Sequence, residues 1–155
     1  MSLSTPYITF PGNAEEVFRY YEDVFGGTLH LLKYDSMPEM AGIPFIPPPN
    51  AVAHAQLLGG DLVLAGGDGF EQPGQEKNLD LSDEVYAILL NLDTIERAHE
   101  IIEKVTSTGG SVAMPFEQAP WGDHYGQVKD RYGVLFHLNV EGDQSLNKGA
   151  TDAGS

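Results

Sequence analysis

The chain repeats one pattern of apolar and polar positions, once in each half. In the first half, a short apolar run at residues 7–10 precedes a Pro-Gly turn and a segment with helical periodicity. The apolar residues of that segment are Val17, Tyr20, Tyr21, Val24 and Phe25. Asn13, with Glu16 three positions later, has the spacing of a helix-capping box, and Gly26-Gly27 predicts the helix end. Strands are expected at about 28–34, 51–58 and 61–65, which makes the first half β-α-β-β-β.

The second half follows the same order of elements. A strand is expected at residues 85–90, and Asp93 with Glu96 predicts a helix start. The apolar stripe of this helix consists of Ile95, Ala98, Ile102 and Val105. Gly109-Gly110 predicts its end, and strands are expected at about 111–114, 124–129 and 134–140. The chain is therefore predicted to be an α+β protein in which two βαβββ modules form a cupped mixed sheet.

Segments outside the two modules differ from them in composition. The modules are placed at 6–65 and 84–141, and residues 66–83, rich in Gly, Asp, Glu and Gln, are predicted to be a linker. Residues 36–50 are rich in Pro and contain two Met, which predicts a long irregular loop over the cup or across a dimer partner. The polar, Gly-containing residues 142–155 are predicted to be a disordered tail.

The charge of the chain restricts its partners. Eight Lys and Arg stand against 23 Asp and Glu, for a formal net charge of −15, which excludes nucleic acid and disfavours anionic membrane surfaces. The acidic surface indicates solubility first, with attraction of cationic ligands or divalent ions as the alternative. With no Cys, the chain has no disulfide, thiolate ligand or Cys nucleophile. No apolar run reaches the ~18 residues of a membrane span. Because Met1–Thr5 also lacks the positive region of a signal peptide, a cytoplasmic protein is predicted.

Several polar side chains interrupt the expected strands at alternating positions. The sets that share a strand face are His54 with Gln56, Tyr125 with Gln127 and Lys129, and His137 with Asn139. Neighbouring polar groups on a strand face indicate either the wall of a ligand cavity or satisfied structural groups. Lys129 is the candidate charge partner of an anionic ligand, or alternatively a structural cap.

Other polar and aromatic residues have simpler interpretations. Trp121 stands in a loop after a Pro, where it is either an aromatic platform for a ligand or an apolar plug. His124 is expected to face solvent, and His30 and His99 are expected on the surface. Asp130 with Gly133 predicts a hairpin turn in which the carboxylate accepts backbone N–H bonds.

Taken in order, these segments resemble the vicinal oxygen chelate superfamily of glyoxalases, fosfomycin-resistance proteins and extradiol dioxygenases, and within it the PhnB-like subfamily. The resemblance spans residues 6 to 141. The segments that carry it are Pro6–Phe10, Gly12–Glu16, Tyr20-Tyr21, Val24–Gly27, His54-Ala55, Trp121-Gly122, Tyr125-Gly126 and the Asp130-x-x-Gly133 turn.

This resemblance implies a homodimer with a small-molecule ligand in the cup. It also implies one divalent metal, such as Zn, Ni, Mn, Co or Fe, held by His, Glu or Gln. The fosfomycin-resistance pattern places its ligands at Tyr7, near Val85 and at His137. Since Val85 cannot bind a metal, His54 becomes the second candidate, and Gln56 or Glu141 would supply a third group.

Three functions remain open from the sequence, and one of them is a regulatory or structural dimer with a vestigial cup. The first is small-molecule binding without an assigned reaction, in a cavity lined by Tyr7, His54, Trp121, Tyr125 and His137. The second is a metal-dependent lyase, isomerase or transferase acting on a small oxygen-bearing substrate, with His54 and His137 as metal ligands. No nucleotide cofactor is expected, because the Gly-rich run at 65–69 is not followed by a helix.

Overall fold

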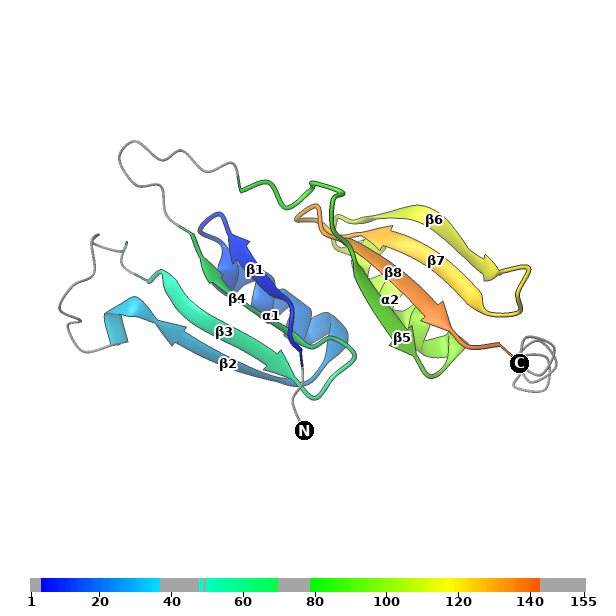
Figure 1. Ribbon diagram of the computed structural model, residues 1–155, viewed down its shortest axis with the longest axis horizontal. Helices are drawn as coiled ribbons and strands as arrows, with labels where there is room; N and C mark the ends of the chain where they lie inside the picture. Colours follow the sequence, from blue (N-terminus) through cyan, green and yellow to red (C-terminus); the bar gives the residue numbers. More distant parts are fainter. Residues whose placement is uncertain (1–3, 37–47, 49, 70–78, 143–155) are drawn as a thin grey trace. The chain divides into compact units, whose positions relative to one another are not determined.

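The computed structural model describes residues 4–36, 48, 50–69 and 79–142. The chain divides into two compact units, residues 1–80 and residues 81–155 (Figure 1). Most of the predicted loop at 36–50, residues 70–78 of the predicted linker and residues 143–155 of the predicted tail lie outside the described residues. No helix in the described part of the chain is long and apolar enough to cross a membrane.

The first unit is one βαβββ module. Its elements are β1 (Tyr7–Phe10), α1 (Ala14–Phe25), β2 (Thr28–Lys33), the short 3₁₀ helix η1 (Tyr34–Ser36), β3 (Val52–Leu58) and β4 (Leu64–Asp68). The strands lie in the order β1-β4-β3-β2, with β1 parallel to β4 and the other pairs antiparallel. In Figure 1, α1 lies against one face of this sheet.

The second unit repeats this topology. Its elements are β5 (Ile88–Leu92), α2 (Ile95–Ser107), β6 (Ser111–Gln118), β7 (His124–Lys129) and β8 (Leu135–Val140). The order is β5-β8-β7-β6, and again only the first and last strands of the module pair in parallel. The predicted α+β fold of two βαβββ modules is therefore confirmed, each module with its own four-stranded mixed sheet.

Three strand boundaries differ from the expected ones. β4 lies at 64–68 instead of 61–65, β5 at 88–92 instead of 85–90, and β6 continues to Gln118. β4 thus extends into the segment expected to begin a linker. Its Gly66 is required by close packing, because a Cβ there would lie 2.5 Å from the carbonyl oxygen of Ile8 on β1. The Gly-rich composition predicted an irregular segment here. The residues instead form a strand with close neighbours.

Each helix covers one sheet face with a stripe that differs by one position from the predicted one. In α1, Phe18 is fully buried and Tyr20 is only half-buried. In α2, Ile101 is fully buried and Ile102 is only half-buried. The buried residues of α2 are Ala98, Ile101 and Val105, at i, i+3 and i+7. Periodicity located both helices but did not fix every residue that faces the sheet.

The helix starts also differ from the predicted capping boxes. Asn13 precedes α1 but makes no side-chain capping hydrogen bond. Asp68 at the end of β4 takes its place, because its Oδ1 accepts from Ala14 N at 2.9 Å. At α2 the cap is Thr94, whose Oγ1 accepts from Arg97 N at 3.1 Å, and not Asp93. The Gly-Gly helix exit at 26–27 is confirmed, with both residues at positive φ.

The α2 cap can be tested by two neighbouring substitutions. Thr94→Ala is expected to lower the free energy of unfolding by about 1 kcal/mol, the usual cost of losing an N-cap side chain. Asp93→Ala, which removes the residue predicted from the capping-box spacing, should cost less than half of that. Urea unfolding followed by circular dichroism measures both. A larger loss for Asp93→Ala than for Thr94→Ala would contradict the assignment of the cap.

Candidate functional site

In each unit, the sheet face opposite the helix carries polar side chains. We call these the first polar face, opposite α1, and the second polar face, opposite α2. On β8, Phe136, Leu138 and Val140 are buried, so the alternating His137 and Asn139 belong to the second polar face. The same alternation places three residues of β7 and two of β5 on that face. They are Tyr125, Gln127, Lys129, Leu89 and Asn91.

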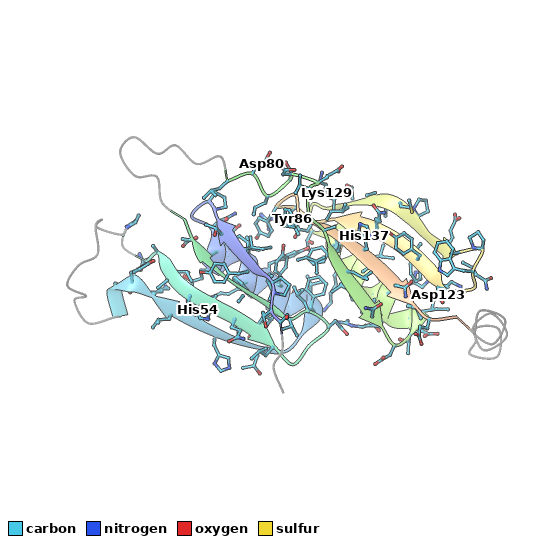
Figure 2. All side chains as sticks on the ribbon, in the orientation of Figure 1. His54, Asp80, Tyr86, Asp123, Lys129 and His137 are labelled. Atoms are coloured by element: carbon cyan, nitrogen blue, oxygen red, sulfur yellow. The ribbon has the colours of Figure 1, made fainter. Side chains whose placement is uncertain are left out.

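A hydrogen-bonded chain of three side chains lies at the centre of the second polar face. The Tyr125 hydroxyl lies 2.6 Å from His137 Nδ1, and Gln127 Nε2 donates to the same hydroxyl at 3.0 Å. The two rings meet edge to face, with centroids 5.7 Å apart and an interplanar angle of 81°. The antiparallel pairing of β7 and β8 brings the three side chains together, because Gln127 on β7 lies directly opposite His137 on β8. Figure 2 labels His137 on β8.

An exposed leucine and an ion pair lie next to the three hydrogen-bonded side chains. Leu89 on β5 lies beside His137 in the parallel register and is 55% exposed. Lys129 Nζ lies 3.4 Å from Glu84 Oε1, an exposed ion pair that contributes little to stability. Lys129 is therefore already paired with a carboxylate.

At the carboxyl ends of β5 and β8, six residues line a hollow of about 510 Å³, namely Asn91, Leu92, Asp93, Asn139, Glu141 and Gly142. Asn139 joins this hollow to the second polar face, because it lies opposite Tyr125 in the antiparallel register of β7 and β8. Asn91 lies beside Asn139 in the parallel register of β5 and β8. Glu141, a candidate third metal ligand from the sequence, lies in this hollow.

The first polar face brings together Tyr7 of β1 and His54 of β3. Their rings stack with centroids 6.2 Å apart and an interplanar angle of 26°. The Tyr7 hydroxyl lies over Gly67, where a Cβ would come within 2.9 Å of it. Partial burial raises the pKa of Tyr7 above its usual value, and the neighbouring Tyr34 hydroxyl raises it further. Tyr7 therefore stays protonated at neutral pH and remains a hydrogen-bond donor.

The sheet face on which His30 lies was not evident from the sequence. This residue was expected on the surface, and it is exposed, but it lies directly opposite Gln56 in the antiparallel register of β2 and β3. It therefore shares the first polar face with His54 and Gln56. Alternation along one strand does not carry this information, because the pairing register between strands decides it.

Three other residues of the second unit had surroundings predicted from the sequence. Trp121 is 62% exposed in the loop between β6 and β7, so it is not an apolar plug within its own unit. His124 was expected to face solvent. This was wrong: it begins β7 half-buried, with its ring 5.9 Å from that of Phe116. Asp130 is 4% exposed and accepts from Tyr132 N and Val134 N, which confirms the predicted turn.

The predicted metal ligands do not form a metal site in either unit. His54 belongs to the first unit and His137 to the second, and Tyr125 occupies the Nδ1 side of His137. Val85 lies in the turn before β5 and is 91% exposed, so the residue beside His137 is Leu89, which has no ligand atom. Within the described ranges, no three His, Cys, Asp or Glu side chains come together. The described residues of either unit alone therefore do not fit a divalent metal, and no chemical step is derived through one.

Comparison with known proteins identifies the family. The model of the Glyoxalase/Bleomycin resistance protein/Dioxygenase superfamily matches residues 6–138, which span both βαβββ modules. The chain belongs to this superfamily. The superfamily predicted from the sequence is thereby confirmed, although membership alone assigns no reaction, because one fold supports many activities.

Relatives of this glyoxalase-superfamily protein match along nearly their whole length. Protein YjdN of Escherichia coli (strain K12) is 25% identical over 152 residues, covering 90% of this chain and 95% of YjdN. The crystal structure of PA1353 from Pseudomonas aeruginosa has a TM-score of 0.71 at 30% identity, covering 92% of this chain and 100% of PA1353. A PhnB protein from Bacillus cereus shares the fold, with a TM-score of 0.65 at 20% identity, covering 90% of this chain and 99% of that protein.

Proposed function

We propose that this glyoxalase-superfamily protein binds a small molecule, and that the second polar face supplies the principal ligand contacts. No reaction is assigned to it. Ligand contacts are proposed for Tyr125, Gln127, Lys129, His137 and Asn139, with Trp121 at the nearby loop. Tyr7, His54 and Gln56 of the first polar face are proposed to contribute if the modules form the predicted cup.

The hydrogen-bonded chain Gln127–Tyr125–His137 is the observation that carries this proposal. Three linked polar side chains on a half-buried sheet face are costly unless their remaining donors and acceptors find partners. The exposed apolar Leu89 stands beside them. A small number of placed polar groups next to apolar surface is typical of small-molecule sites. A purely structural sheet face would need neither the linked polar chain nor the exposed leucine.

Metal-dependent catalysis is the alternative that the family suggests, and the metal-binding side chains described within each unit give it no support. Elemental analysis of the purified protein tests it directly. One divalent ion per chain, lost in both His54→Ala and His137→Ala, would replace our proposal with the metal-dependent one. A homodimer and a cytoplasmic location are proposed from the resemblance and the composition.

Blocking the second polar face sterically tests the proposal. Leu89→Trp places a large ring beside His137 without removing any member of the hydrogen-bonded chain. We expect hits from a thermal-shift screen of small oxygen-bearing molecules to lose most of their stabilising effect in this variant. The matched control is Val112→Trp, since Val112 is similarly exposed but pairs with the buried Val128 and so belongs to the helix side of the sheet.

Two results would overturn the proposal. One is a screen in which no compound raises the melting temperature of the wild-type protein. The other is a set of hits that stabilise Leu89→Trp as strongly as Val112→Trp, because such ligands would bind elsewhere.

A further inference from the structure

The hydrogen-bonded chain on the second polar face has a direction that its donors and acceptors determine. A Tyr hydroxyl has one hydrogen to donate and two lone pairs, and a neutral imidazole has one N–H and one bare nitrogen. Gln127 Nε2 donates to the Tyr125 hydroxyl at 3.0 Å, so this oxygen already accepts one hydrogen bond. The remaining question is which way the proton lies in the 2.6 Å contact with His137 Nδ1.

Only one of the two directions lets the Tyr125 hydroxyl both accept and donate a hydrogen bond within the protein. If the Tyr125 hydroxyl donates to Nδ1, the bonds run from Gln127 through Tyr125 to His137 in one direction, and each reinforces the next. If instead Nδ1–H donated to the hydroxyl, the hydrogen of the Tyr125 hydroxyl would need a further acceptor. Among the described residues, the hydroxyl has no protein partner besides Gln127 and His137. A half-buried hydroxyl without an acceptor costs free energy, so the first direction is favoured.

We infer that Gln127 fixes His137 in the tautomer that carries its proton on Nε2, so that the second polar face meets its ligand as a hydrogen-bond donor. The ligand class that follows is a molecule with an exposed acceptor oxygen, such as a carbonyl, carboxylate or phosphoryl oxygen. Gln127 is a positioning residue in this arrangement, because it acts on the ligand only through Tyr125 and His137. The ligand part of the inference rests on the proposed function, whereas the tautomer does not.

The tautomer is measurable by long-range ¹H–¹⁵N correlation spectroscopy of the His137 ring at a pH where the ring is neutral. We expect Nδ1 to show the shift of a bare nitrogen and Nε2 that of a protonated one. In Gln127→Glu, the carboxylate offers only acceptors, so the Tyr125 hydroxyl would donate to it and His137 would move its proton to Nδ1. Gln118→Glu adds the same charge at the end of β6. Because Gln118 is not part of the hydrogen-bonded chain, this variant should leave the tautomer unchanged.

Wild-type protein with the proton on Nδ1, or a tautomer that does not respond to Gln127→Glu, would overturn the inference. The ligand class is tested separately with trimethylphosphine oxide, which has an acceptor oxygen and no donor. It should shift the His137 Nε2 signal of the wild-type protein and not that of Gln127→Glu. No shift in the wild-type protein would overturn the ligand class. Failure of the Leu89→Trp experiment, in contrast, would overturn the proposed function while leaving the tautomer result intact.

Discussion

Asp68→Ala is expected to lower the free energy of unfolding by about 3 kcal/mol, because hydrogen bonds to a charged acceptor contribute roughly 1.5–3 kcal/mol each. The Asp68 carboxylate accepts from two backbone amides, each at the start of an element. Oδ1 accepts from Ala14 N at the start of α1 at 2.9 Å, and Oδ2 accepts from Val52 N at the start of β3 at 2.8 Å. The side chain thus joins three elements of the first unit. Urea unfolding followed by circular dichroism measures the loss.

Two further variants make this test specific. Asn13→Ala removes the residue predicted to cap α1, and because Asn13 makes no capping bond, its cost should stay below ~1 kcal/mol. Asp68→Asn keeps one acceptor oxygen and should fall between the wild-type protein and Asp68→Ala. Amide hydrogen exchange at Ala14 and Val52 should accelerate in Asp68→Ala. An Asn13→Ala variant that is less stable than Asp68→Ala would refute the assignment of the cap to Asp68.

His137→Ala is expected to weaken ligand binding at the second polar face by roughly thirtyfold, which corresponds to about 2 kcal/mol of lost interaction. The change removes the ring whose Nε2 is proposed to donate to the ligand. It also leaves the Tyr125 hydroxyl and the Gln127 amide without the acceptor that ends their chain. The measurement is isothermal titration of whichever screening hit stabilises the wild-type protein most.

The control for His137→Ala is His99→Ala. His99 lies on α2, exposed and in ring contact with Phe116, and takes no part in the hydrogen-bonded chain. Its removal should leave the dissociation constant within about twofold of the wild-type value. Equal affinities of the wild-type protein and His137→Ala would show that the ligand does not use this face. Melting temperatures of both variants show whether any loss of binding reflects unfolding instead.

The candidate site was partly visible in the sequence. Tyr125, Gln127, His137 and Asn139 were singled out because they interrupt apolar alternation, and all four lie on the second polar face. The hydrogen bonds among them were not predictable, since the 2.6 Å contact joins residues 12 positions apart through a strand register. Of the predicted metal pair, His137 came from the family pattern and His54 was a substitute for the position near Val85, and the two residues belong to different units.

The sequence by itself determined the order of elements, the two βαβββ modules and the helix ends at Gly26-Gly27, because these depend on periodicity and on residues with special backbone freedom. Only the tertiary structure decided which side chains act together. The α1 cap comes from Asp68, 54 positions away, and His30 joins the first polar face through its pairing with Gln56. In both cases the partners meet through strand pairing, and the register of that pairing is set by packing over the whole sheet and not by any local stretch of sequence.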